Sequence, residues 1–345
     1  MHAIPFYVVF VIPAAWLVGY ALGGPWVLLP VVLIFGVVPA LDTVLGHDRH
    51  DADGDEEQAR ARNPLYDLAL ATWVPVQLGV LALGLLRAAQ GAGWAELAGL
   101  ALATGILTGG GGINVAHELM HRVDRRHRAL AEVLMLAVSY PWFCVEHVLG
   151  HHRRVATPDD PTTSRLGETL YAFLPRTLWG GLRSAWGLER DRCARRGIRA
   201  TSWRDRRTRY AVELAVLHLG LLALAGPTGW LFFVAQAAIA VLLLETINYV
   251  EHYGLMRADT GDGRFERVQP HHSWNSTHRL TGWFLFQLPR HADHHAHASR
   301  PYWKLRAWPD APQLPFGYPT MVLVALVPPL WFRMMDARAT QLAAT

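Results

Sequence analysis

The chain has 345 residues, of which 52% are hydrophobic and only 17% are charged, and its formal net charge is +4. Its mean hydropathy is positive, at +0.15, and the apolar residues form long blocks, which argues against a soluble enzyme with a large apolar core. The small excess of positive charge gives no indication of nucleic-acid binding, because membrane topology alone would produce it.

Apolar stretches long enough to cross a bilayer, which takes about 20 residues, occur at six places. They cover residues 4–22, 26–45, 68–86, 97–112, 210–226 and 230–249. Turn-forming Gly-Pro sequences at 24–25 and 226–229 predict that two pairs form hairpins. The sequence therefore predicts an all-α integral membrane protein with about six transmembrane helices, in a single domain over residues 1–345.

The polar segments between these stretches differ in length. Three of them are long, at residues 46–67, 117–209 and 251–306, and the other turns are short or nearly uncharged. The positive-inside rule places the three long segments in the cytoplasm. Residues 318–333 are apolar but carry three prolines, so we expect an interfacial segment there rather than a seventh span.

Histidine is the unusual residue of this sequence, with 18 copies. Many of them lie in three short motifs, HELMH at 117–121, HVLGHH at 147–152 and HADHH at 291–295, and another follows the last span at position 252. Histidines at i and i+4 share one helix face, so both imidazoles can reach one metal ion. The nine candidate metal ligands are His117, His121, His147, His151, His152, His252, His291, His294 and His295.

Nine imidazoles are too many for one zinc site, which takes about four ligands. They suit two metal ions, although imidazole alone leaves the identity of the metal open. A zinc protease is the obvious competitor for the H-E-x-x-H motif. A metal transporter or haem carrier would instead place ionisable residues within the spans, and here the spans are almost free of them, Glu245 and His218 being exceptions.

Acidic residues adjoin the histidine motifs. Glu118, Glu146, Glu251 and Asp293 are candidates for orienting the ligand imidazoles and fixing their tautomers, and Asp159 and Asp160 follow the second motif. A direct carboxylate bridge between two metal ions is the less favoured interpretation. The two cysteines, Cys144 and Cys193, form no C-x-x-C pair, so any electron-transfer centre built from thiolates must belong to another protein.

Longer motifs carry a resemblance to a known family. HELMHR at 117–122, EHVLGHHRRVATPDDP at 146–161, NYVEHYGL at 248–255, HSWNS at 272–276 and RHADHHAH at 290–297 resemble the signatures of alkane 1-monooxygenases and the related xylene monooxygenases. Both belong to the membrane fatty-acid desaturase and hydroxylase superfamily. The resemblance implies a centre of two iron ions held by the nine histidines, a multi-pass position in the bacterial inner membrane, and electrons from a soluble rubredoxin and its rubredoxin reductase.

The resemblance further implies hydroxylation of the terminal carbon of an alkane, with dioxygen as the oxidant. Hydroxylation of a methyl group on an alkylaromatic such as xylene is the alternative, and fatty acyl desaturation or hydroxylation is another. Met120 and Arg122 in the first motif, and Pro289 before the third, depart from the usual alkane pattern, which bears on substrate range more than on metal binding.

Two further expectations concern substrate and partner. An apolar pocket between the spans would hold the hydrocarbon, and Trp16, Trp26 and Trp73 are candidates for setting its depth. The stretch 183–209 is rich in arginine, including Arg195, Arg196, Arg204, Arg206 and Arg207. It reflects either positive-inside topology or an electropositive docking surface for an acidic rubredoxin.

Overall fold

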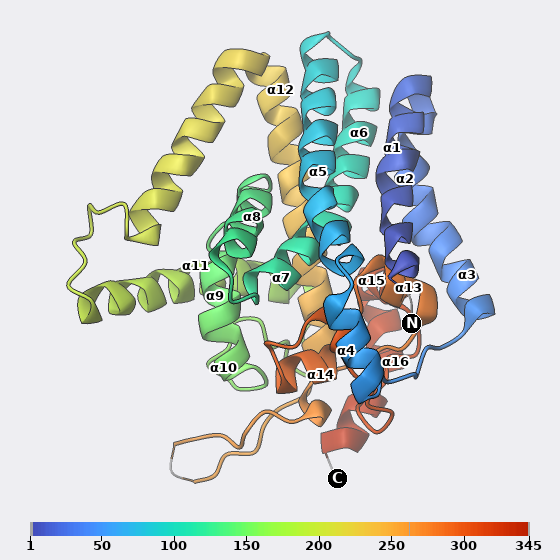
Figure 1. Cartoon of the computed structure of the whole chain (residues 1–345), viewed down its shortest axis with the longest axis vertical. Helices are drawn as coiled ribbons and strands as arrows, with labels where there is room; N and C mark the ends of the chain where they lie inside the picture. The colour runs from blue at the N-terminus through green and yellow to red at the C-terminus, as the bar shows by residue number, and fades with distance from the viewer. Residues whose placement is uncertain (1–2, 262, 344–345) are drawn as a thin grey trace.

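The structure is a computed structural model that describes residues 3–261 and 263–343. Within those residues it is built from helices and turns, with three isolated β-bridges and no strand. Upright helices stand side by side in the upper part of the molecule, and shorter helices and loops gather beneath them (Figure 1). The predicted all-α fold is therefore confirmed.

Five helical segments are long and apolar enough to cross a membrane. They are Ile4–Leu22, Gly24–Leu45, Leu65–Ala89, Trp94–Met120 and Arg206–His252. Their component helices are η1 (Ile4–Phe10), α1 (Val11–Leu22), η2 (Gly24–Leu28), α2 (Leu29–Val32), η3 (Leu33–Val37), α3 (Val38–Leu45), α5 (Leu65–Ala89), α6 (Trp94–Ile106), η4 (Leu107–Ile113), α7 (Asn114–Met120) and α12 (Arg206–His252).

The long helix α12 contains both of the last two predicted spans. It breaks at Gly226, whose φ of 67° lies in the left-handed region that glycine adopts without a steric penalty. Pro227 follows and lacks the N–H that a continuous helix needs. Figure 1 shows one arm of α12 rising to this point and the other descending into the bundle, so the predicted turn at 226–229 is present.

The span Trp94–Met120 is the most enclosed of the five. In its most apolar window 78% of the residues are buried, against 22% for Gly24–Leu45. Small residues permit this close packing. A Cβ atom on Gly109 would lie 2.9 Å from Cα of Ala240 on α12, and one on Gly111 would overlap the Trp73 ring of α5.

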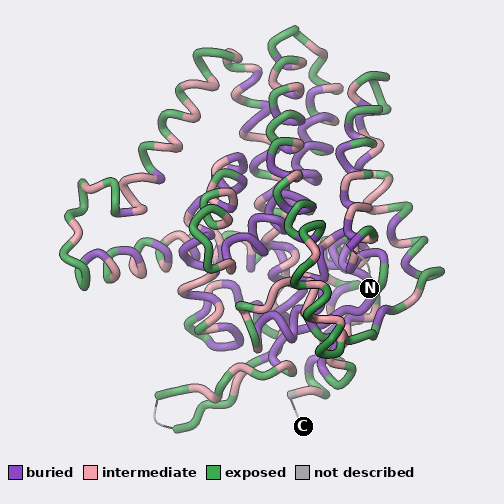
Figure 2. The backbone as a smooth tube through the Cα atoms, in the orientation of Figure 1, coloured by how far each residue is buried: buried purple, intermediate pink, exposed green. Residues whose placement is uncertain are grey.

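Below the spans, the remaining helices surround a buried centre (Figure 2). They are α4 (Gly54–Arg62), α8 (Arg125–Leu136), α9 (Phe143–Glu146), η5 (His147–His151), α10 (His152–Arg154), α11 (Leu170–Arg195), η6 (Pro270–His272), α13 (Arg279–Phe284), α14 (His291–Ala296) and η7 (Tyr302–Lys304). The chain ends in α15 (Tyr318–Ala325) and α16 (Pro328–Ala343), which meet at 118°. The proline-rich 318–333 stretch is thus sharply bent and forms no straight seventh span.

Candidate metal centre

The nine candidate ligands come from four separate segments that meet at the lower ends of the spans. His117 lies on α7 and His121 directly follows it. The second motif forms η5 and α10, His252 is the last residue of α12, and the third motif forms α14. Residues about 180 positions apart in sequence are thereby brought together, as the three motifs predict.

Five of the nine form one group. Ring nitrogens of His117, His121, His147, His152 and His294 all lie within 4.8 Å of one another. The Nε2 atom of His147 is 3.1 Å from that of His121 and 3.1 Å from that of His152. Two imidazole nitrogens on one ion, each bound at about 2.0–2.1 Å, would be roughly 2.9–3.4 Å apart, so this donor set fits a metal ion.

The other four histidines form a second group. The Nε2 atom of His295 lies 3.2 Å from that of His151 and 2.9 Å from that of His291. The Nε2 atom of His291 is in turn 3.3 Å from that of His252. Oε2 of Glu251 approaches the same His291 nitrogen to 3.2 Å, so one carboxylate faces this second set of imidazoles. The donor set again has the spacing of ligands around one ion.

The second motif is not an ordinary α-helix. Residues His147–His151 form a π-helix, which has a wider turn than an α-helix. As a result, His147 shares its group with His152, five residues on, while His151 joins the other group. The sequence predicted that His147 and His151, at i and i+4, could reach one metal ion. In the structure His147 lies with His152 instead. Single π-turns occur often at functional sites.

Burial favours the neutral form of most of these imidazoles. Burial, followed by the nearby His151, lowers the pKa of His121 to about 3. Burial and neighbouring histidines also hold the pKa values of His294 and His295 well below their usual range. The neutral imidazole is the form that binds a metal ion. His151 is the exception, because its contact with Asp160 outweighs burial and raises its pKa.

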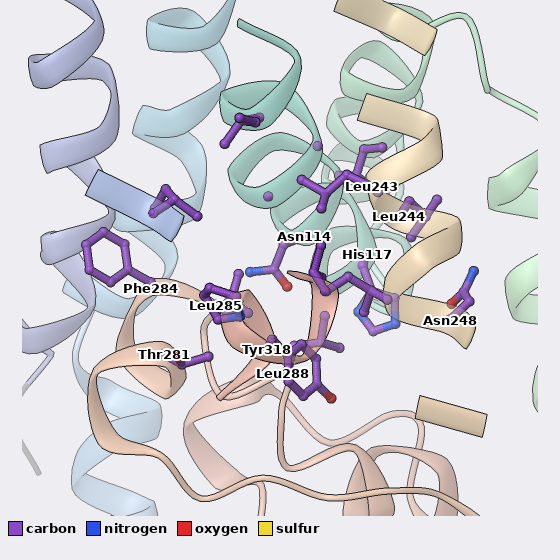
Figure 3. A pocket seen from close by; sticks show the side chains of 18 of the residues that line it. Asn114, His117, Leu243, Leu244, Asn248, Thr281, Phe284, Leu285, Leu288 and Tyr318 are labelled. Atoms are coloured by element: carbon purple, nitrogen blue, oxygen red, sulfur yellow. The ribbon is translucent and has the colours of Figure 1, made fainter. Parts of the chain in front are cut away.

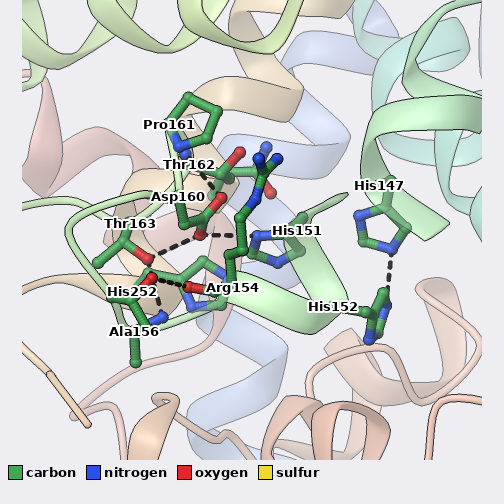
Figure 4. Close-up of polar contacts among 12 residues, drawn as sticks. His147, His151, His152, Arg154, Ala156, Asp160, Pro161, Thr162, Thr163 and His252 are labelled. Carbon is green, nitrogen blue, oxygen red and sulfur yellow. Dashed lines mark hydrogen bonds and ion pairs between the residues drawn. The ribbon is translucent and has the colours of Figure 1, made fainter. Parts of the chain in front are cut away.

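Asp160 orients one of the candidate ligands. Its Oδ2 atom lies 2.9 Å from Nδ1 of His151 and also accepts a hydrogen bond of 2.7 Å from the Thr163 hydroxyl (Figure 4). A carboxylate at Nδ1 fixes the proton there and leaves Nε2 free for the cluster. Burial alone would raise the pKa of Asp160, but the contacts with His151 and Thr163 together outweigh it and lower that pKa.

The four carboxylates expected to orient imidazoles have different surroundings. Among the described residues, Glu118 binds Arg122 and the backbone N–H of Tyr302, and Glu146 binds Arg154 and Ser184. Neither of these carboxylates contacts any of the nine imidazoles.

Asp293 instead anchors the loop after α14. It accepts hydrogen bonds from Arg300 and Trp308, each at 2.7 Å, and contacts the ring of His297, which is outside the cluster. Only Glu251 of the four contacts an imidazole of the cluster, and its Oε1 atom accepts a hydrogen bond of 2.7 Å from Tyr318. Sequence reasoning missed Tyr318, because nothing in its local sequence links it to the histidine motifs.

An apolar cavity ends at the histidines (Figure 3). Its walls come from the first two spans, α6 with η4 and α7, the descending arm of α12, α13 and α15. In Figure 3, Leu243 and Leu244 lie on one side, Phe284 and Leu285 on the other, and Asn114 between them. Three histidines line one end, His117 and His147 from the first group and His291 from the second.

The tryptophans expected to set the depth of this cavity do not line it. Trp16 and Trp73 are buried against other helices, where their indole N–H groups bind Thr104 and Gln77. Trp26 is 54% exposed on the outer surface. The cavity wall is formed instead by smaller side chains that include Ile12, Ile34, Ile106 and Leu243. That expectation was therefore wrong.

Comparison with known proteins assigns the family. The sequence model of the fatty acid desaturase family matches residues 92–325, which include every histidine of the cluster. Alkane 1-monooxygenase 1 of Pseudomonas aeruginosa is 43% identical over 318 residues, or 91% of this chain and 83% of that protein. The chain belongs to the alkane 1-monooxygenase branch of the fatty acid desaturase family.

Other members and relatives of this branch match similarly. Alkane 1-monooxygenase 2 of P. aeruginosa is 40% identical over 327 residues, covering 94% of this chain and 86% of that protein. The hydroxylase component of a xylene/toluene monooxygenase of Pseudomonas putida is 30% identical over 345 residues. The match covers 97% of this chain and 88% of that protein. The chain is accordingly an oxidoreductase of the monooxygenase class, with a metal site among its histidines and several membrane-spanning helices.

Proposed function

We propose that this protein inserts one oxygen atom of dioxygen into a terminal methyl C–H bond of an alkane and so forms a primary alcohol. The observation that carries the proposal is the apolar cavity, which ends at His117, His147 and His291. A hydrocarbon lying in it would present one end to both histidine groups.

We further propose that each group holds one iron ion. The five-histidine group would bind the first through His117, His121, His147, His152 and His294. The second would be bound by His151, His252, His291 and His295, with Glu251 close enough to add a carboxylate oxygen. When bound, the irons supply reductive activation of dioxygen with two external electrons, and the second oxygen atom leaves as water.

The protein's own residues would bind and orient the substrate. Leu243, Leu244, Phe284 and Leu285 give the chain an apolar wall, so the shape of the cavity would set much of its position. The same wall excludes water from the end at His117 and His291. Asp160 would keep His151 in the tautomer whose Nε2 faces the cluster.

An alkane is favoured over an alkylaromatic by two lines of support. The alkane 1-monooxygenases of P. aeruginosa share 40 and 43% of their aligned residues with this chain, whereas the xylene/toluene relative shares 30%. The cavity also runs past several turns of α6 and η4, from His117 to Ile106, which suits an extended chain. Methyl hydroxylation of xylene remains the second candidate, since the histidine motifs are shared.

Electrons would come from a rubredoxin and its reductase. Both cysteines of the chain are buried and unpaired, at Cys144 and Cys193, so the chain offers no thiolate cluster. In the arginine-rich stretch, Arg206 and Arg207 are held by Glu189 and Asp205, whereas Arg195, Arg196 and Arg204 are exposed. These three are among the exposed arginines of the stretch, with Arg183, Arg190 and Arg199, that could attract an acidic partner.

We place the protein in the bacterial inner membrane with the histidine cluster on the cytoplasmic side. The support is the excess of arginine in the long polar segments, which lie at the same end of the spans as the cluster (Figure 1).

Product analysis tests the proposed reaction. Cells that express the chain with a rubredoxin and its reductase would be fed octane, hexadecane and p-xylene together. Primary alkanols would support the proposal. If 4-methylbenzyl alcohol is the sole product, the substrate is an alkylaromatic and the alkane assignment is wrong. Oxidised acyl lipids with neither of these products would contradict both hydrocarbon assignments.

A further inference from the structure

Four consecutive glycines, Gly109 to Gly112, lie in the π-helix η4, two turns before His117. Three of them are needed for packing. A Cβ atom would lie 2.9 Å from Ala240 at Gly109, would overlap the Trp73 ring at Gly111 and would overlap the Gln77 amide at Gly112. These three positions are also buried.

Gly110 has different surroundings. A Cβ atom there would meet one heavy atom within 4 Å, Cδ2 of Leu243 at 4.0 Å, which is an ordinary van der Waals contact. Its backbone lines the apolar cavity, and it is half-buried where the other three glycines of the run, Gly109, Gly111 and Gly112, are fully or almost fully enclosed. Packing therefore does not require glycine at this position, but an open cavity does.

The position of Gly110 along the cavity is intermediate. Ile106, Gly110, Asn114 and His117 all line it, at spacings of four, four and three residues that follow one face of the helix. At about 1.5 Å of rise per residue, Gly110 lies roughly 10 Å and Ile106 roughly 16 Å from His117 along this axis. The cavity thus continues beyond Gly110, away from the histidines.

We propose that Gly110 sets the length of hydrocarbon that the cavity admits, because its missing side chain leaves the passage between η4 and Leu243 open. The inference rests on the proposed function, of which it specifies the substrate range. A side chain at position 110 would point across the cavity at Leu243 and close the part that leads to Ile106. The part between Asn114 and His117 would remain available to a short chain.

The test uses Gly110→Ala, Gly110→Val and Gly110→Leu in the full-length protein, supplied with its electron donors and a mixture of pentane, octane, dodecane and hexadecane. One methylene in an apolar pocket changes relative rates about 10- to 200-fold. We expect the ratio of long-chain to short-chain product to fall at least about tenfold from glycine to leucine. Oxidation of the shortest alkane accepted should persist.

Gly79→Leu is the matched control. Gly79 also lies within a span, on α5, but it is exposed and a Cβ atom there meets nothing within 4 Å. The Gly79→Leu variant should give the same distribution of product chain lengths as the unchanged protein. If Gly110→Leu keeps the original chain-length profile, or loses short and long products alike while keeping its iron, the proposal is overturned.

Binding provides a readout that does not depend on the reaction. A ligand that binds the folded state raises its thermal midpoint, so the purified proteins would be heated with each alkane in turn. The unchanged protein should be stabilised by hexadecane and Gly110→Leu by octane or pentane only. Length-dependent stabilisation without any alkanol would refute the proposed function but support the role of Gly110, whereas equal stabilisation of both proteins by hexadecane would refute that role.

Discussion

His147 and His152 are five residues apart, yet their Nε2 atoms lie 3.1 Å from each other and point into the same group of imidazoles (Figure 4). In an α-helix the residue that shares a face with His147 would be His151. The π-turn at His147–His151 widens the helix and turns His151 toward the other group, where its Nε2 atom is 3.2 Å from that of His295. One motif thereby contributes to both proposed ions.

The division of the nine histidines into two groups predicts that removing a ligand from either group lowers the amount of bound iron. His147→Ala should remove a ligand of the five-histidine group, and His291→Ala one of the other group. Each variant should lose activity and bind less iron than the unchanged protein, while still inserting into the membrane. Iron analysis of the purified proteins measures this, with His50→Ala, at an exposed histidine outside the cluster, as the control. Full iron and full activity in either variant would disprove its assignment as a ligand.

Asp160→Asn should weaken metal binding without unfolding the protein. Loss of the carboxylate at Nδ1 of His151 removes the group that fixes its tautomer, and such changes typically reduce metal affinity about 10- to 100-fold. Competition with a chelator of known affinity measures the change. Asp159→Asn alters the adjacent exposed carboxylate and should leave metal affinity unchanged; equal affinities in both variants would show that Asp160 does not position His151.

Gly111→Ala should destabilise the helix bundle. The added methyl group would overlap the buried Trp73 ring, and overpacking of this kind costs about 1–3 kcal/mol. Thermal unfolding in detergent should show a lower midpoint than in the unchanged protein. Gly79→Ala adds the same methyl group where nothing lies within 4 Å and should not lower the midpoint. Unaltered stability in Gly111→Ala would mean that α5 and η4 pack less closely than described.

Glu189 should make stability depend on pH. Burial alone would raise the pKa of its carboxyl, but hydrogen bonds from Arg192 and Arg206 outweigh burial and lower the pKa from 4.5 to about 2. Because the folded-state pKa is the lower one, this contribution is complete above about pH 4.5 and is lost as the pH falls toward 2. Thermal midpoints between pH 7 and pH 3 should fall less in Glu189→Gln than in the unchanged protein.

Asp191→Asn is the control for that experiment, since Asp191 is half-exposed and pairs with its exposed neighbour Arg190. It should follow the pH profile of the unchanged protein. If the pH profile of Glu189→Gln coincides with those of the unchanged protein and of Asp191→Asn, the Arg192 and Arg206 contacts contribute no pH-dependent stability.

Much of this architecture follows from the sequence. Long apolar blocks need bilayer-length helices whatever their partners, so the positions of the spans could be predicted, including the break at Gly226. The meeting of the nine histidines also follows, because all lie at the same end of those helices. Their role as metal ligands stays a prediction.

Other features depend on packing that no local pattern reports. The sequence of the second motif predicts an ordinary α-helix. The π-turn at His147–His151 instead changes which imidazoles lie in the same group. Glu118 and Glu146 adjoin ligands in sequence but bind arginines, whereas Asp160, nine residues from His151, contacts its ring. The depth of the cavity likewise depends on how α6 faces α12, and sequence alone does not fix that orientation.

The hydrogen bond between Tyr318 and Glu251 has a consequence for how the protein is made. Tyr318 also lines the cavity beside the histidines, so a segment beyond the last histidine motif forms part of the enclosure. During synthesis, the chain would leave the ribosome with all nine imidazoles before this wall exists. If the histidines bind metal as proposed, the ions would have an interval for entry, after His295 has emerged and before Tyr318 closes over Glu251.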